Sequence, residues 1–510
     1  MTNRNRFFYN GILLTVVGLA LRGAGLFFGA YISRAVGAEA VGLHSLIMTV
    51  YSFAVTLATS GISLTVTRLV AGAVAEVGEG GGGRVLRGAV LYSLLFGMLA
   101  SLGLFTLAGS LGELVLGYSE GTIALRILSL SLIPTALSSV FSGYFVGVKR
   151  VACNALVQVF GQLFRIGYTV FLVARMASGD PHRAVTLLCL GTTVTELVCF
   201  LIVLVEFIID RLCRRAREGG GALLRPVFGM ALPLAASAYI RSALLTLEHS
   251  LIPKGLKKRG EDRESALSSY GYLHGMALPL ILYPMAPLSS FAGLLVPEFA
   301  AEGEGSAERH RRIASEAVND TLLYSSVAAV FLYIFSEELG YTVYGSYDAG
   351  HYIALLSPVV PIMYLDHVTD SILKGIGEHV YSMWVNIADS LISVALVFFL
   401  IPIMGIGGYA VVIVGMELFN FILSIVRLRG RIRFSADLFG SFLLPLVAAM
   451  LAALLSKCLF LSVGRQITAL LLVGKIVFAV CAFIAIRYIL IWLVGAHNKI
   501  RIKRKEGLSH

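Results

Sequence analysis

The chain has 510 residues, of which 57% are hydrophobic and only 14% are charged, and its formal net charge is +11 at pH 7. A soluble protein normally carries about 25% charged residues, so this composition excludes a soluble multidomain protein and indicates an integral membrane protein. The positive charge does not indicate nucleic-acid binding, because the basic residues lie mostly between the apolar segments, where they direct membrane topology.

Apolar segments recur along the whole chain, and each is long enough to cross a hydrocarbon core of about 30 Å. The first one is not expected to be a cleaved signal peptide, because it is too long, contains Arg22 and is followed directly by another span. The predicted fold is an all-α polytopic membrane protein. The fourteen predicted spans are residues 8–33, 41–67, 86–110, 121–147, 152–174, 184–209, 223–247, 267–297, 317–336, 350–373, 380–401, 405–426, 437–460 and 467–494.

The distribution of basic residues orients these spans. An even number of spans places both termini on the same side, and with the N-terminus inside, the inner segments hold most of the Lys and Arg residues. The positive-inside rule therefore predicts cytoplasmic termini in a bacterial cytoplasmic membrane. One basic segment, the predicted loop 253–264, falls outside. Either a span is miscounted there, or the loop meets an anionic head group, or it is a tolerated exception.

Several other chemistries are not expected. The six cysteines form no CxxC pair and no Cys/His cluster, so we predict neither a disulfide framework nor a metal site. The run GEGGGGR (78–84) lacks the GxxxxGK[ST] pattern and is predicted to be a flexible inner loop. No Walker motif occurs anywhere, so ATP hydrolysis by this chain is not expected. Residues 298–316 form a charged inner connector.

A weak internal repeat relates two parts of the chain. When Gly42 is aligned with Gly271, GISLTVTR (61–68) falls opposite SFAGLLVP (290–297). In each half, the preceding span carries an arginine and ends in a basic, loop-like segment, at Ser33-Arg34 and at Ile252-Pro253-Lys254. We predict two six-helix lobes related by a pseudo-twofold axis, with the substrate path at their interface. The predicted domains are residues 1–218, 219–434 and a terminal helix pair with a basic tail at 435–510.

Arg22 is the most informative charge within a span. A charged side chain at mid-bilayer costs roughly 2.5–3.5 kcal/mol, and at 1.5 Å per residue Arg22 lies roughly 18 Å from Arg34, too far to snorkel. Gly18, Gly25 and Gly29 share its helix face, so it is predicted to face a polar interior. The alternative is an arginine that a structural carboxylate neutralises. Arg241 is its expected counterpart in the second half.

Polar faces recur on other spans. Any one of them fits helix packing as well as ligand contact, but together they predict a hydrated central cavity. Because guanidinium groups suit phosphate and pyrophosphate oxygens, we expect an anionic, phosphate-bearing substrate. The candidate substrate-binding residues are Arg22, His44, Gln162, Arg165, Arg241 and His274, and polar faces with carboxylates carry Glu248, Asp366, Asp370 (with Lys374), Asn386 and Asp389.

Three segments resemble a known family. They are LRGAGLFFGAYISRAVGAEAVGLHSLI (21–47), SGYFVGVKR with QVFGQLFRI (142–166), and ILKGIGEH (372–379). The chain is similar to the multidrug/oligosaccharidyl-lipid/polysaccharide exporter superfamily, in its stage V sporulation protein B and polysaccharide-biosynthesis branch, which is related to the lipid II flippases. The resemblance implies a carrier that flips a saccharide linked to undecaprenyl pyrophosphate. This chain differs from the family's usual pattern at two positions. Phe28 stands where a second cavity arginine is usual, and His274 replaces another cavity arginine.

The resemblance also implies possible coupling to Na⁺ or H⁺, with Glu248, Asn386 and Asp389 as counterparts of a known ion site and Asp366 and Asp370 as further candidates. No threonine stands at the matching start of the twelfth span. The expected partners are the lipid-linked saccharide and membrane lipid, with no nucleic acid and a monomeric protein. Alternatives are a cation-coupled multidrug antiporter or a membrane glycosyltransferase or polymerase, although no outer loop is long enough for an obvious acid-base site.

Overall fold

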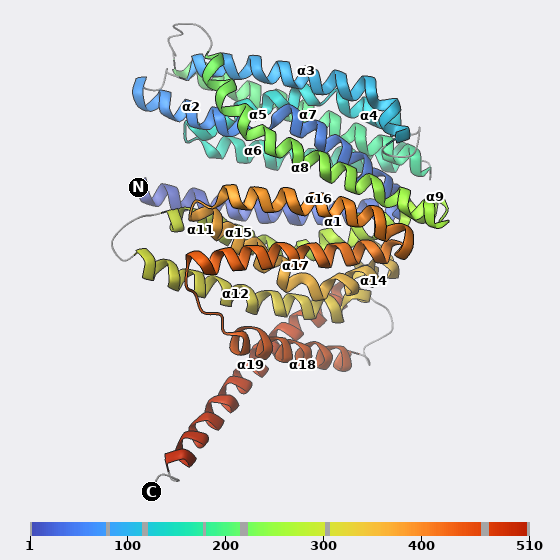
Figure 1. Ribbon diagram of the computed structural model, residues 1–510. Helices are drawn as coiled ribbons and strands as arrows, with labels where there is room; N and C mark the ends of the chain where they lie inside the picture. The colour runs from blue at the N-terminus through green and yellow to red at the C-terminus, as the bar shows by residue number, and fades with distance from the viewer. Residues whose placement is uncertain are drawn as a thin grey trace. The chain divides into compact units, whose positions relative to one another are not determined.

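The computed structural model describes residues 3–77, 82–114, 121–176, 180–214, 223–300, 306–460 and 469–506, and within them the chain is helical with no strand. Helices satisfy their own backbone polar groups, as a lipid environment requires. The elements, most of them labelled in Figure 1, are α1 (Asn3–Thr59), α2 (Ile62–Val77), α3 (Gly83–Leu114), α4 (Gly121–Ser129), α5 (Leu132–Gly147), α6 (Val151–Met176), α7 (Pro181–Arg214), α8 (Leu224–Arg259), α9 (Arg263–Tyr270), the π-helix η1 (Gly271–Ala277), α10 (Leu278–Leu282), α11 (Met285–Ala300), α12 (Ser306–Ile334), α13 (Ser336–Leu339), the π-helix η2 (Gly340–Tyr344), α14 (Tyr347–Leu356), the 3₁₀ turn η3 (Ser357–Val359), α15 (Val360–Gly375), α16 (His379–Met404), α17 (Ile406–Arg431), the π-helix η4 (Phe439–Leu443), α18 (Leu444–Leu459) and α19 (Ala469–Glu506).

The predicted all-α polytopic fold is confirmed. Within the described residues, ten helical regions are long and apolar enough to cross a membrane, or thirteen if each of three bent pairs counts as one span. The first region, Gly18–Val74, is 57 residues long and contains the second part of the predicted span 8–33 and all of the predicted span 41–67. Gly37 separates them with φ 82° and ψ 172°, a conformation that is essentially restricted to glycine. The chain is therefore a multi-pass membrane protein.

The described chain forms two compact units. Unit 1 comprises Met1–Gly275 and Asn386–Tyr409. Its main core is built where α2, α3, α5, α7 and α8 converge, and Figure 1 shows α3, α5 and α7 side by side there. Tyr92 and Phe145 are the largest fully buried side chains of this core. Tyr92 packs edge-on against Phe228 of α8, with ring centroids 4.9 Å apart.

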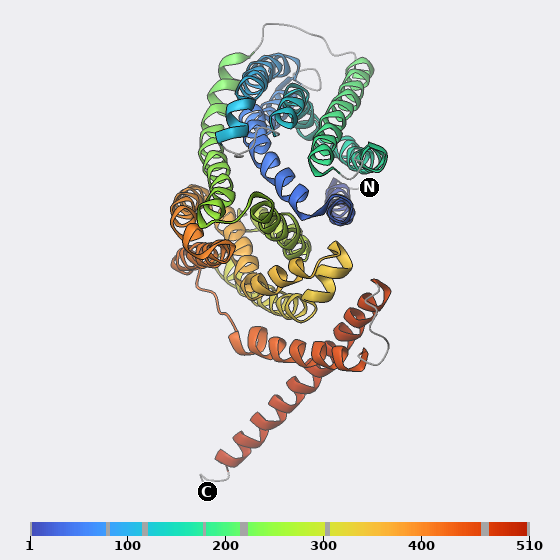
Figure 2. The same cartoon turned by 90° about the vertical axis from the view of Figure 1, so that its right-hand side faces the viewer.

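Unit 2 comprises Met276–Val385 and Ala410–His510. One core lies where α11, α12, α15 and α17 meet, and a second lies between α12, α18 and α19. Both views show α18 and α19 crossing as a pair, with the far end of α19 extending beyond α18 (Figure 2). Alanines of α18 permit this close packing, since Ala448, Ala449, Ala452 and Ala453 are fully buried. The lobe boundaries expected from the sequence stay a prediction.

The two glycines that the repeat alignment pairs are in contact within unit 1. A Cβ added to Gly42 would lie 3.1 Å from the amide nitrogen of Gly271, and a Cβ on Gly271 would lie 2.9 Å from that of Gly42. A Cβ on Gly42 would also collide with the carbonyl oxygen of Leu267, and one on Gly271 would collide with that of Ala38. The same alignment pairs Ala38 with Leu267, so the contact is reciprocal, as at a twofold axis.

Some predicted loops are helical, so these parts of the prediction are wrong. Helix α1 continues through Ser33 and Arg34, and α8 continues past Pro253 to Arg259. The segment after Pro253 is packed in unit 1: a Cβ on Gly255 would lie 2.7 Å from Cγ2 of Ile401, and Lys258 Nζ lies 5.1 Å from the Phe398 ring centroid. The segment 337–349, which separates the predicted spans 317–336 and 350–373, is not a loop but contains α13, η2 and the start of α14.

Candidate substrate and ion sites

Arg22 and Arg241, the two arginines that were paired across the predicted halves, both belong to unit 1. Both side chains are exposed, on α1 and α8 of unit 1, and neither forms an ion pair with any residue of the described ranges. For Arg22 the alternative of a neutralising carboxylate therefore finds no support in this part of the chain. The face of Arg22 is open at two of its glycines, since a Cβ on Gly18 or Gly29 would meet no atom within 4 Å.

The polar face of α6 packs against the same stretch of α1. Arg165 donates from Nη2 to Oε1 of Gln162 over 2.8 Å, and a Cβ on Gly25 would lie 3.6 Å from Nε2 of Gln162. The guanidinium carbon of Arg165 lies 5.9 Å from the centroid of the Phe28 ring. Arg165 therefore supplies a guanidinium beside the α1 position at which the second arginine of the resembled pattern is missing.

An acidic residue outside the predicted set, Glu196, belongs to this region. Glu196 on α7 accepts a hydrogen bond from Thr135 Oγ1 over 3.2 Å, and it is close enough to Arg165 to interact with it electrostatically. His44 lies at the edge of the group, with Nδ1 3.9 Å from Sγ of Cys189. The sequence does carry a sign of this residue: Glu196 is a lone glutamate in an apolar segment, and an ionisable residue in a span is by default a candidate functional residue.

The candidate coupling residues separate into two groups. In unit 1, Glu248 of α8 accepts a hydrogen bond from Ser393 Oγ of α16 over 2.7 Å, and the Asp389 carboxylate of α16 is close enough to repel it. Asn386 lies less than one turn before Asp389 on the same helix, and its carbonyl oxygen accepts a hydrogen bond from Ser390 over 3.0 Å. Glu248 and Asp389 are thus two carboxylates at one place.

Asp366 and Asp370 lie on α15 of unit 2 instead. Asp370 forms an ion pair with Lys374 over 2.5 Å, one turn along the helix, as the spacing predicts. Asp366 interacts with Ser424 of α17. No group of three or more His, Cys, Asp and Glu side chains in the described ranges could hold a metal ion.

His274 lies in an aromatic cluster. Its ring stacks on Tyr270 with centroids 5.1 Å apart and planes 6° apart, and it lies 4.3 Å from the ring of His249. The Tyr270 hydroxyl and His249 Nδ1 are 3.1 Å apart. His249 and Tyr270 went unnoticed in the sequence, because they come from α8 and α9 and only folding joins them to η1. The predicted cavity role of His274 stays a prediction.

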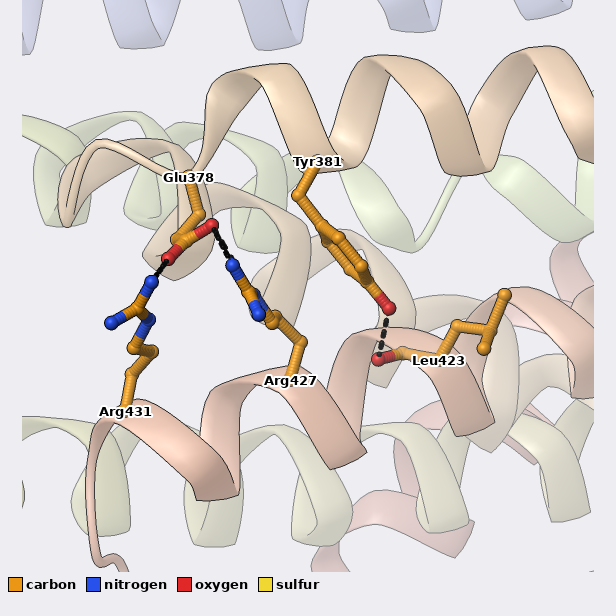
Figure 3. A network of polar contacts seen from close by, with 5 residues as sticks. All are labelled: Glu378, Tyr381, Leu423, Arg427 and Arg431. Atoms are coloured by element: carbon orange, nitrogen blue, oxygen red, sulfur yellow. Dashed lines mark hydrogen bonds and ion pairs between the residues drawn. The ribbon is translucent and has the colours of Figure 1, made fainter.

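A second arginine cluster surrounds Glu378, in the turn between α15 and α16. Arg427 donates from Nη2 to Oε2 of Glu378 over 2.8 Å, and Arg431 binds Oε1 over 2.5 Å (Figure 3). These two guanidinium groups, Arg427 foremost, hold the pKa of the Glu378 carboxyl below its usual value. Tyr381 donates to the carbonyl oxygen of Leu423 over 3.2 Å and so tightens the same joint between α16 and α17.

Known proteins resemble this chain along most of its length. Stage V sporulation protein B of Bacillus subtilis (strain 168) is 24% identical over 428 residues, which is 81% of this chain and 81% of that protein. Sporulation protein YkvU of the same strain is 20% identical over 406 residues, covering 78% of this chain and 88% of that protein.

Solved structures share the fold. The lipid II flippase MurJ in an inward closed conformation matches with a TM-score of 0.73 at 12% identity, over 94% of this chain and 98% of that one. An inward-facing multidrug resistance MATE family transporter of the MOP superfamily matches with a TM-score of 0.66 at 17% identity, over 82% and 98%. The polysaccharide biosynthesis protein family model matches residues 7–287. The predicted resemblance is confirmed: the chain belongs to the polysaccharide biosynthesis protein family, and it shares its fold with a transporter of the MOP superfamily.

Proposed function

We propose that this protein is a secondary transporter that flips a saccharide linked to undecaprenyl pyrophosphate, an oligosaccharide or a peptidoglycan precursor, outward across the bacterial cytoplasmic membrane. Its product would serve cell-wall, spore-cortex or polysaccharide synthesis. The protein acts as a monomeric transporter and not as an enzyme, with both termini in the cytoplasm. Its partners are the lipid-linked saccharide and membrane lipid, and nucleic acid is not among them.

The observation that carries the proposal is the exposed Arg22. It is a permanent charge within a span, and no carboxylate of the described chain neutralises it. A structural arginine in lipid would be expected to have such a partner, because the charge is costly there. A pyrophosphate is the ligand that would pair with it, and guanidinium groups bind phosphate oxygens in a bidentate way. Arg165, held by Gln162, adds a second guanidinium beside the same stretch of α1.

Directional transport requires that the inward and outward states bind the substrate differently. We propose that Glu248 and Asp389 take up the coupling ion, Na⁺ or H⁺. Two carboxylates that repel one another are stabilised when a proton or a cation binds between them. Ser393, which donates to Glu248, holds that carboxylate in place on α8 against α16. Asn386 would add an amide oxygen as a ligand.

The test is transport by protein reconstituted in vesicles. A fluorescent undecaprenyl-pyrophosphate saccharide starts in one leaflet, and a membrane-impermeant quencher outside reports its arrival. We expect Arg22→Gln to lower the flipping rate at least about tenfold, since a charged hydrogen bond to phosphate contributes about 1.5–3 kcal/mol. Arg22→Lys keeps the charge but loses the guanidinium fork, and should retain intermediate activity.

The matched control is Arg126→Gln. Arg126 is also an arginine within a predicted span, but it lies near the helix end in α4 and rests over the ring of Phe105 at 5.5 Å. Its substitution should leave the flipping rate unchanged. Equal rates in wild type and Arg22→Gln would refute the role of Arg22. Movement of cationic dyes, without movement of the labelled lipid, would refute flipping and establish the multidrug antiporter.

A further inference from the structure

A cavity of about 700 Å³ opens in unit 2 beside the Glu378 network. Its walls come from the start of α12, the turn 376–378, and the end of α17 with the two residues that follow. All three segments are predicted to lie on the cytoplasmic side. Because α15 ends at Gly375, α16 begins at His379 and α17 ends at Arg431, the cavity lies at the level of the helix ends.

The walls carry more positive than negative charge. Arg311, Arg431 and Arg433 line the cavity, against Glu308 and Glu378. Both oxygens of Glu378 are already engaged, Oε2 by Arg427 and Oε1 by Arg431. The carboxylate is thus compensated by two guanidinium groups.

The other two arginines of the cavity wall differ in ion pairing from the arginines on either side of Arg311. Arg309 pairs with Glu298, and Arg312 pairs with Glu316 over 3.6 Å. Arg311 and Arg433, by contrast, are exposed and form no ion pair in the described part of the chain. In the connector 298–316, Arg309 and Arg312 are therefore paired with glutamates, whereas Arg311, which lines the cavity, has no ion pair in the described residues.

His310 adds a polar group without a partner. Its ring packs on Phe299, with centroids 5.0 Å apart, and its buried Nε2 has no hydrogen-bond partner among the residues described. Ile376 and Ile432 supply apolar surface to the same cavity. Guanidinium groups next to apolar side chains at the end of transmembrane helices suit a ligand with a phosphate at one end and hydrocarbon at the other.

We propose that this cavity binds the phosphate of an anionic membrane lipid from the cytoplasmic leaflet, with Arg311 and Arg433 as its principal contacts. The cavity volume falls within the range of about 300–1,000 Å³ that is usual for ligand sites. This volume is larger than a bare phosphate requires. The site does not involve Arg22 or Arg241, so it stands or falls independently of the flipping proposal.

The experiment measures lipid binding to the purified full-length chain by native mass spectrometry. Phosphatidylglycerol is compared with phosphatidylcholine of the same acyl chains, and inorganic pyrophosphate serves as a soluble competitor. Phosphatidylglycerol should bind wild type about tenfold more tightly than phosphatidylcholine. Arg311→Gln and Arg433→Gln should each weaken phosphatidylglycerol binding about tenfold, whereas Glu308→Gln should strengthen it. Phosphatidylcholine binding should not change.

Arg312→Gln is the matched control, because Arg312 belongs to the same connector but pairs outside the cavity with Glu316, and it should bind phosphatidylglycerol as wild type does. All variants should share the melting midpoint of lipid-free wild type. The proposal is overturned if the two lipids bind equally, or if Arg311→Gln and Arg433→Gln behave like Arg312→Gln. Binding of pyrophosphate without any preference for phosphatidylglycerol would assign the site to a soluble phosphate and overturn the lipid assignment.

Discussion

The contact between Gly42 and Gly271 supports a prediction that joins the sequence repeat to stability. We expect Gly42→Ala and Gly271→Ala to destabilise the protein by similar amounts. In each case the new methyl group would collide with a carbonyl oxygen of the opposite helix, that of Leu267 or that of Ala38. A backbone carbonyl cannot rotate away as a side chain can, so the two helices must separate.

The magnitude follows from the size of the collision. Overpacking a close helix contact costs typically about 1–3 kcal/mol, and the gain in helix propensity from Gly to Ala offsets about 1 kcal/mol of that. A net loss of up to about 2 kcal/mol is therefore expected for each single substitution. Gly29→Ala on the same helix α1 is the control: no atom lies within 4 Å of its Cβ, so it should be neutral or slightly stabilising.

The assay is reversible unfolding in mixed micelles, read as the free energy of unfolding of the two single variants, the double variant and the control. Once one methyl group has separated the helices, the second should find space. The double variant should therefore cost little more than one single variant, with a coupling energy of about 1 kcal/mol or more. Costs that add in full, or a Gly42→Ala cost no greater than that of Gly29→Ala, would refute the reciprocal contact.

Two further predictions concern charges of unit 2. Because Arg427 and Arg431 lower the pKa of Glu378 below its usual 4.5, the stabilisation that they provide is complete above that pH and is lost as the pH falls through the lowered pKa. Glu378→Gln should thus be less stable than wild type at pH 7, and thermal melts from pH 7 to pH 3 should show the difference disappearing; a constant difference would refute the pairing. Glu338 lies 3.6 Å from Lys475, and both side chains are about nine-tenths buried. Glu338→Gln should cost about 3–5 kcal/mol by leaving a buried charge, and adding Lys475→Met should recover much of the loss in the same unfolding assay; no recovery would argue against the pair.

Much of the fold follows from local pattern. A span is recognised from some twenty consecutive residues, so the helical membrane architecture could be predicted without any tertiary information. The turn periodicity placed Arg22 on a face of glycines, and the same periodicity placed Lys374 one turn after Asp370, where the ion pair forms. Local pattern failed at Pro253, which lies inside helix α8 although proline usually ends a helix. Two residues later, Gly255 packs closely on Ile401.

Which residues meet in a candidate site depends on the tertiary structure more than on local sequence pattern. Glu196 meets Thr135 and Arg165 from three different helices, and His249 meets His274 only when α8 lies beside η1. Such groups are separated by up to tens of residues, and no periodicity connects them.

The sequence by itself determined that this is a helical membrane protein with charged residues within its spans, because hydropathy and helix periodicity are properties of short stretches. Only the tertiary structure decided which charges have partners. Glu378 is held by two arginines, whereas Arg22, Arg241, Arg311 and Arg433 are left without an ion pair in the described chain. That distinction requires distances between helices, and an ion pair forms only across a few ångströms.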